Sequence, residues 1–171
     1  MSGRQPAGRR YPVRRERPDW DTWALSLAEV VAIRADCTRA QVGAVILNKK
    51  HRVIGQGYNG ALPGVPGCLT AGACPRGRKS YAELAANSDY ADCIATHAEE
   101  NAIRDALDKG IDASELKKAT LYVTREPCPA CKTLIAAVGI GRIVVQKEDD
   151  ECSPQAAPWR SMLNRAVNSR G

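Results

Sequence analysis

Two short stretches of this sequence hold residue types that can bind a metal ion. HAE at residues 97–99 places a histidine two positions before a glutamate, and PCPAC at residues 127–131 holds two cysteines in a C-x-x-C spacing. A C-x-x-C supplies two thiolate ligands, and His97 is a candidate for a third. A structural zinc site uses four protein ligands, whereas a catalytic zinc site keeps one position open. His97, Cys128 and Cys131 therefore predict a catalytic zinc site.

A catalytic zinc site of this kind needs a proton carrier beside the metal. Zinc lowers the pKa of a bound water molecule from about 15.7 to about 7, which makes the water a nucleophile at neutral pH. Glu99 lies two residues after His97 and can move protons without being a ligand itself. We therefore assign Glu99 the role of general acid and base.

Neither motif is specific when it is taken alone. A lone C-x-x-C also suits a redox pair or half of a zinc knuckle, and a lone histidine is more often a structural residue. The pairing of H-x-E at residues 97–99 with P-C-x-x-C at residues 127–131 is more specific. It is the signature of zinc deaminases that act on cytosine or adenine rings. Zinc-dependent hydrolysis is therefore the favoured chemistry.

Both stretches lie where the sequence predicts a helix start. Proline is favoured in the first helical turn, so Pro129 predicts a helix with Cys128 at its N-cap, closed by Gly139. His97 opens an amphipathic stretch that runs to about Lys109. The positive end of a helix favours thiolate over thiol, which suits metal binding.

The other elements follow from hydrophobic periodicity and turn residues. We predict a helix from Asp19, an antiparallel hairpin, two later strands that alternate with helices, and two short additional helices. Alternation of strands and helices favours parallel pairing, so the expected fold is a three-layer α/β/α sandwich around a mixed sheet. The corresponding ranges are helices 20–36 (after the N-cap Asp19), 81–91 and 158–170 and strands 41–48, 52–59, 119–124 and 142–146.

Length and charge narrow the function classes. The chain has 171 residues and a net charge of +6, and six arginines against one glutamate in residues 1–18 account for most of the excess. We expect a basic disordered arm at residues 1–16 and a single domain over residues 17–171. The arm is a solubilising tail or a nucleic-acid contact. The nearly neutral remainder argues against a nucleic-acid track.

The sequence contains no apolar run near the roughly 18 residues that a membrane span needs, and no apolar segment follows the basic N-terminus. We therefore expect a cytoplasmic protein. Seven cysteines in such a protein suggest metal binding more than disulfides.

The chain resembles the cytidine and deoxycytidylate deaminase superfamily, in particular its deoxycytidylate-acting branch. The matching stretches are RPDWDTWAL at 17–25, QVGAVI at 41–46, GYNGALPG at 57–64, HAEENAI at 97–103, ATLYVTREPCPAC at 119–131 and GIGRIVV at 139–145. The resemblance implies a central mixed five-stranded sheet and hydrolysis of dCMP to dUMP and ammonia. It also implies that His97, Cys128 and Cys131 bind zinc and that Glu99 is the proton shuttle.

The resemblance implies further contacts to the substrate. The backbone N–H of Ala98 would bind the carbonyl oxygen of the base, and the side chain of Asn59 would bind the 3′-hydroxyl of the sugar. Taken without the resemblance, Asn59 in Tyr-Asn-Gly is an ordinary turn residue. Members of the family are commonly hexamers, and many respond to dCTP with Mg²⁺ as activator and to dTTP as inhibitor.

The resemblance also allows a second, structural zinc ion. Four cysteines precede or flank the histidine motif and would form its ligand set: Cys37, Cys68, Cys74 and Cys93. The alternative is four separate buried thiols, which behave as small hydrophobic side chains. Cys152 has no evident partner, and we assign it no role.

Two other functions stay open at this point. The first is deamination of another base or of a polynucleotide, because Glu126 before Pro127 also resembles guanine and tRNA-adenosine deaminases. The second is a non-catalytic zinc-stabilised interaction module, in which Glu99 would be dispensable.

Overall fold

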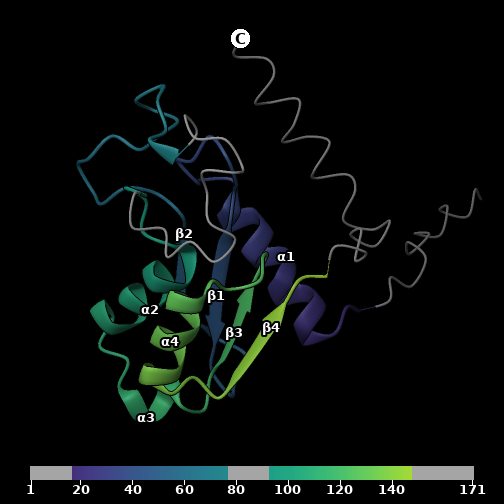
Figure 1. Ribbon diagram of the computed structural model, residues 1–171. Coiled ribbons are helices and arrows are strands. Elements are labelled where there is room, and N and C mark those ends of the chain that lie inside the picture. The colour runs from purple at the N-terminus through teal and green to yellow at the C-terminus, as the bar shows by residue number, and fades with distance from the viewer. Residues whose placement is uncertain (1–16, 77–92, 148–171) are drawn as a thin grey trace, which may run out of the picture.

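The computed structural model describes residues 17–76 and 93–147, which form a mixed sheet with helices against it (Figure 1). The elements in chain order are α1 (Trp20–Ala32), β1 (Gly43–Leu47), β2 (Val53–Tyr58), α2 (Ala98–Asp108), α3 (Ala113–Leu116), β3 (Thr120–Val123), α4 (Pro129–Val138) and β4 (Arg142–Val145). No helix in these ranges is long and apolar enough to span a bilayer.

The sheet has the strand order β2-β1-β3-β4. β1 pairs antiparallel with both β2 and β3, and β3 pairs parallel with β4. The predicted antiparallel hairpin and the later parallel pair are therefore confirmed. Gly43 at the start of β1 pairs with Tyr58 at the end of β2, and its neighbour Ala44 pairs with Val123 at the end of β3. The segment entering β1 and those leaving β2 and β3 consequently meet at one edge of the sheet.

Helices cover both faces of this sheet (Figure 1). The side chains of β1 alternate between the faces, as the two-residue period of a strand requires. Val45 and Leu47 pack with Ala24 and Ala28 of α1. On the other face, α2 and α4 pack on a larger apolar cluster that includes Ala44, Ile46, Leu121, Val123, Ala102 and Ile135.

Helix α2 lies unusually close to β2 because two glycines face it. A Cβ added to Gly55 would lie 2.3 Å from the carbonyl oxygen of Ala102. A Cβ added to Gly57 would lie 2.3 Å from the amide nitrogen of Ala102 and 2.4 Å from the carbonyl oxygen of Ala98. Any side chain at these positions would force the helix away from the strand, so the glycines set the position of the first turn of α2.

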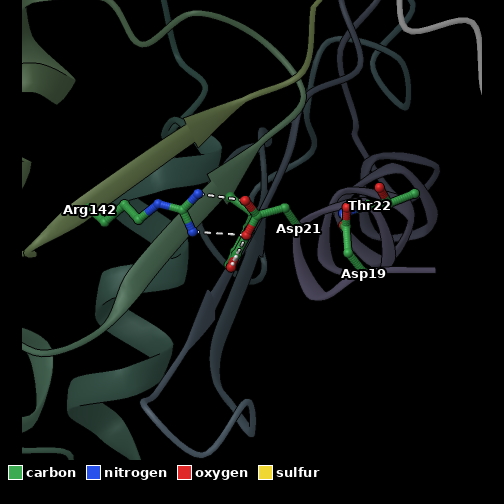
Figure 2. Close-up of polar contacts among 5 residues, drawn as sticks. Asp19, Asp21, Thr22 and Arg142 are labelled. Atoms are coloured by element: carbon green, nitrogen blue, oxygen red, sulfur yellow. Dashed lines mark hydrogen bonds and ion pairs between the residues drawn. The ribbon is translucent and has the colours of Figure 1, made fainter. Parts of the chain in front are cut away.

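The N-terminus of α1 is bonded to β3 and to the edge strand β4. Asp19 is the N-cap and accepts a hydrogen bond from the amide of Thr22 at 2.7 Å. Asp21 accepts two hydrogen bonds from the guanidinium of Arg142 on β4, at 2.8 and 2.5 Å, and one from the Tyr122 hydroxyl at 2.8 Å. Figure 2 shows the cap and the ion pair. The stretch RPDWD thus contributes a helix cap and a bidentate ion pair.

The structure agrees with most of the predicted elements and adds one. The short helix α3 was not predicted, because four residues are too few to show periodicity; Asp112 caps it through the amides of Ser114 and Glu115. The α/β class and the mixed sheet are confirmed, with four strands in the described residues where five were predicted. The basic arm, the predicted helices 81–91 and 158–170 and Cys152 lie outside the described residues.

Candidate active site

His97 and the two cysteines of the C-x-x-C lie together, at the starts of two neighbouring helices. His97 is the N-cap residue of α2, with extended backbone angles and no side-chain capping bond. Cys128 is the N-cap of α4. The imidazole Nδ1 of His97 lies 3.3 Å from the sulfur of Cys131 and 3.4 Å from that of Cys128. Two helix starts therefore bring three potential ligand atoms to one point.

The three atoms fit a zinc ion. All of them lie within 4.8 Å of one another. Zinc–sulfur bonds of about 2.3 Å and zinc–nitrogen bonds of about 2.0 Å in a tetrahedron separate neighbouring ligand atoms by roughly 3.5 Å. The sulfur of Cys128 also accepts the amide N–H of Cys131 at 3.5 Å, which sets the two sulfurs on the first turn of α4. Donor type and spacing both match a His/Cys/Cys zinc site.

Glu99 lies beside this group on the first turn of α2. Its side chain is almost inaccessible, with 4% of the residue exposed. Burial, and after it the charge of Glu99, raises the pKa of the Cys131 thiol. The position of Cys131 at the start of a helix, taken alone, predicted a lowered thiol pKa instead. A bound cation would reverse the effect, because a thiol that coordinates a metal ion is deprotonated outright.

The group opens into a cavity of about 360 Å³. Its lining combines the helix starts with the segments that enter β1 and leave β2 and β3: Cys37, Arg39, Ala40, Val42, Asn59, Cys68, Cys74, Arg76, Cys93, Ala95, His97, Ala98, Glu99, Arg125, Glu126 and Cys128. Every predicted site residue except the buried Cys131 is in this lining. The cavity is within the usual range for a small-molecule site.

Asn59 holds the backbone of the segment that leads into β1. Its Oδ1 accepts the amide N–H of Val42 at 2.8 Å, and its Nδ2 donates to the carbonyl oxygen of Ala40 at 2.9 Å. The residue is 8% exposed and lines the cavity. One amide hydrogen and one lone pair are left over from these two bonds. Asn59 therefore has a structural role, and the predicted bond to a sugar hydroxyl stays a prediction.

The four remaining cysteines in the described residues line the same cavity, and three of them act on the fourth, Cys68. Burial raises the pKa of Cys68 to about 11, with further contributions from the hydrogen bond to Cys74 and the charges of Cys74, Cys37 and Cys93. Among the described residues, the zinc triad is the group whose ligand atoms all lie within 4.8 Å, so the four-cysteine group is more open. Binding of one ion by all four cysteines stays a prediction.

Asp36 joins the two segments that carry Cys37 and Cys68. Its carboxylate accepts the amide of Gly67 at 3.1 Å, the amide of Thr70 at 2.9 Å and the hydroxyl of Thr70 at 2.7 Å. These bonds, led by the one from the Thr70 hydroxyl, lower the pKa of Asp36. Its own amide donates to the carbonyl oxygen of Asn59 at 3.2 Å.

Asp36 and the arginines of the lining, Arg39, Arg76 and Arg125, were not predicted from the sequence. No local signal marks these residues; the side chains of Asp36 and Arg39, for example, bond to residues more than 30 positions away in the sequence. The placement of Arg39 and Arg125, just before β1 and just after β3, could have pointed to the sheet edge where the cavity lies.

Comparison of the sequence with known protein families and proteins points to cytidine and deoxycytidylate deaminases. The sequence model of the cytidine and deoxycytidylate deaminase zinc-binding region matches residues 18–147. The deoxycytidylate deaminase of Mycobacterium phage D29 is 51% identical over 136 residues, which cover 77% of this chain and 98% of that protein. The deoxycytidylate deaminase of Saccharomyces cerevisiae is 36% identical over 128 residues, or 75% of this chain and 38% of the yeast protein.

Comparison with solved structures supports the fold. The apo structure of the dCMP deaminase of cyanophage S-TIM5 aligns with a TM-score of 0.54 and 23% identity, covering 78% of this chain and 87% of that one. The structure of the same enzyme with dCMP and dUMP has the same score and covers 77% and 83%.

Proposed function

Because this chain belongs to the cytidine and deoxycytidylate deaminase zinc-binding family, we propose that it is a zinc-dependent hydrolase that converts dCMP to dUMP and ammonia. The observation that carries the proposal is the convergence of His97, Cys128 and Cys131 beside the buried carboxylate of Glu99 in one cavity. A relative named deoxycytidylate deaminase, 51% identical over nearly its whole length, supports the choice of substrate.

The proposed reaction adds water to C4 of the cytosine ring and expels the 4-amino group. His97, Cys128 and Cys131 would hold a zinc ion, which would supply the acidity that makes water nucleophilic at neutral pH. Glu99 takes a proton from that water and delivers it to N3 of the ring, and later carries the second proton to the leaving amine. The C4–O bond forms and the C4–N bond breaks, so dCMP and one water give dUMP and ammonia.

The burial of Glu99 suits it to transfer protons between the water and the base. A carboxylate screened from solvent has a stronger effect on neighbouring charges than an exposed one, and it keeps bulk water from competing for the proton. The backbone N–H of Ala98, at the first position of α2, is proposed to bind the carbonyl oxygen of the base. The remaining donor capacity of Asn59 is proposed to bind the 3′-hydroxyl, so the variant Asn59→Ala should discriminate less between dCMP and its 3′-deoxy analogue.

We further propose a structural zinc ion held by Cys37, Cys68, Cys74 and Cys93, which line the same cavity. The hydrogen bond between Cys68 and Cys74, and the effect of Cys37 and Cys93 on Cys68, support a cluster of neighbouring thiols. Metal analysis of the purified protein would show two zinc ions per chain if this is right and one if the four thiols are separate.

Finer features of the family are proposed for the whole protein. They are a fifth strand completing a three-layer sandwich, a homo-oligomer such as a hexamer, cytoplasmic location, and effector control by dCTP with Mg²⁺ and by dTTP. Gel filtration tests the assembly, and dCMP saturation curves with each nucleotide test the effectors.

The first experiment compares substrates and uses Glu99→Gln as a matched control. Ammonia release is followed with dCMP, dCTP, CMP, deoxycytidine, guanine and a cytosine-bearing single strand. We expect turnover of dCMP and a loss of about 10²- to 10⁴-fold in Glu99→Gln, with zinc retained. Turnover of guanine or the single strand instead would indicate another deaminase. Equal rates in both proteins would refute the assigned role of Glu99, and zinc binding without any turnover would indicate an interaction module.

A further inference from the structure

A basic–aromatic cluster lies on the surface at the end of the sheet away from the cavity: Arg17, Trp20, Lys49, Lys50, His51 and Arg52. β1 and β2 pair at the cavity edge through Gly43 and Tyr58, so the turn that joins them, residues 48–52, lies at the opposite end of both strands. The start of α1 reaches this turn, because the ring of Trp20 stacks on that of His51. None of these residues lines the cavity, and the proposed deamination uses none of them.

The rings of Trp20 and His51 form a flat stack on the surface. Their centroids lie 4.1 Å apart with an interplanar angle of 2°, and Trp23 packs edge-on against Trp20 at 5.5 Å. Trp20 is 43% exposed, and His51 is exposed as well. Within residues 17–76 and 93–147, no ring other than Trp20 packs on the imidazole of His51. A further flat ring can therefore stack on the face of His51 that is turned away from Trp20.

His51 has a backbone conformation that favours glycine. Its φ is 56°, and it is the one non-glycine residue with a positive φ in the described ranges. The side chain of Asn48 holds the turn by accepting the amides of Lys50 and Arg52 at 3.0 and 3.1 Å, and it donates to Glu115 at 2.9 Å. Glycine would fit this position without strain, so the geometry of the turn does not explain the imidazole. Residues in such conformations cluster at functional sites.

Four exposed cations lie beside this stack: Arg17, Lys49, Lys50 and Arg52. The guanidinium carbon of Arg17 lies 5.7 Å from the centroid of the Trp20 ring, and the other three flank His51 in the turn. Among the described residues, none of the four takes part in an ion pair. The carboxylates at the start of α1 are engaged elsewhere, since Asp19 caps the helix and Asp21 is paired with an arginine of β4. The basic–aromatic cluster therefore combines exposed rings with positive charge that no ion pair neutralises.

The chain enters this cluster from its most basic stretch. Residues 1–16 hold five arginines against one glutamate and join the cluster at Arg17. A complementary partner carries repeated negative charges and flat rings, and the phosphates and bases of a single-stranded nucleic acid supply both.

We propose that the basic–aromatic cluster binds single-stranded nucleic acid, with phosphates on its four cations and a base stacked on His51. The nearly neutral charge of the rest of the chain limits this to a short contact. The inference goes beyond the proposed function and does not depend on it, because the strand is a partner bound outside the cavity and not the substrate.

Fluorescence anisotropy with labelled oligothymidylate tests the proposal in the full chain, with residues 1–16 identical in every variant. His51→Gly should weaken binding about five- to tenfold, because one base–ring stack is lost while glycine suits the positive φ. Lys50→Gln and Arg52→Gln should each lower the slope of log K against log salt concentration by about 1. Arg34→Gln is the matched control, because Arg34 is exposed and lies beyond the other end of α1, roughly 20 Å from Trp20 by the helix rise.

An abasic strand of the same length separates base stacking from charge alone. It should bind the parent more weakly than oligothymidylate does, and His51→Gly should leave its affinity unchanged. Equal affinities of the two strands for the parent, or equal salt slopes in the parent, Lys50→Gln and Arg52→Gln, would overturn the proposal. Tighter binding to vesicles of anionic phospholipid than to oligothymidylate would also overturn it and would indicate a membrane contact. Circular dichroism establishes that each variant is folded.

Discussion

The two walls of the cavity are built in different ways. The metal wall comprises the first turns of α2 and α4, with His97, Cys128 and Glu99 fixed by regular backbone geometry. The loop wall comprises residues 36–42 and 59–76, which contain no strand or helix of the sheet core and are joined by side-chain bonds to Asp36 and Asn59. The candidate metal ligands thus lie at the starts of regular helices, whereas the loop wall consists of segments whose position depends on single side chains.

Substitutions at the two walls are therefore expected to affect different steps of the reaction. Under the proposed function, a change at the metal wall should remove a ligand or a proton carrier and act on the chemical step. A change at the loop wall should displace lining residues such as Arg39 or Asn59 and act on substrate binding. The effects should therefore separate into kcat and KM.

The largest effect is expected from loss of a ligand. Cys131→Ala should remove the zinc from the triad and reduce turnover of dCMP to background, because two remaining ligands do not form a catalytic site. Zinc content by atomic absorption and ammonia release are measured on the same sample. Zinc loss should leave the fold largely intact, as seen by circular dichroism, and full activity in this variant would contradict the triad.

A smaller effect is expected at the loop wall. Asp36→Asn should raise KM for dCMP roughly tenfold and change kcat less than threefold, because an amide cannot accept all three bonds from Gly67 and Thr70. Asp112→Asn is the matched control, since Asp112 also accepts two backbone amides but caps α3 and bonds to no segment of the loop wall. If Asp36→Asn and Asp112→Asn had the same KM and kcat, the loop wall would have no special effect on substrate binding.

The smallest effect is expected outside both walls, at the pair between Asp21 and Arg142. The hydrogen bonds from Arg142, ahead of that from Tyr122, lower the pKa of Asp21 below 3.8. The pair therefore stabilises the fold above that pH, and the contribution is lost as the pH falls through the lowered pKa. Asp21→Asn should cost about 0.5–1 kcal/mol of unfolding free energy at pH 7, given the exposure of the pair.

Urea unfolding from pH 7 down to pH 3 checks this expectation. The difference between parent and Asp21→Asn should shrink below about pH 4. Arg142→Gln should show coupling to Asp21→Asn in a double-mutant cycle, because the two side chains form one bidentate contact. A difference that grows on acidification would contradict the lowered pKa.

The metal wall could be predicted from the sequence because its signals are local. Cys128 with Pro129 marks the start of α4, and Gly139 marks its end, as the structure has them. Two ligand-bearing helix starts on one face of a sheet then have few ways to pack.

The loop wall could not be predicted in the same way. Asp36 reaches Gly67 and Thr70 across more than 30 positions, and Asn59 reaches back to Ala40 and Val42. Such bonds depend on the tertiary arrangement of segments that lack periodicity. The choice between a turn residue and a ligand at Asn59 was open for this reason, and the structure adds a third role, as a support for the segment before β1.

The two glycines of β2 that face α2, Gly55 and Gly57, limit which substitutions keep His97 in place at the start of that helix. The atoms that a side chain at Gly57 would strike belong to the backbone of Ala98, Asn101 and Ala102, so a smaller side chain elsewhere on α2 cannot relieve the clash. Substitutions at Gly55 or Gly57 should therefore lack local second-site suppressors, unlike most packing defects. To return His97 to its position, α2 would have to move as a whole. We therefore expect that no single second substitution compensates for a side chain at Gly55 or Gly57.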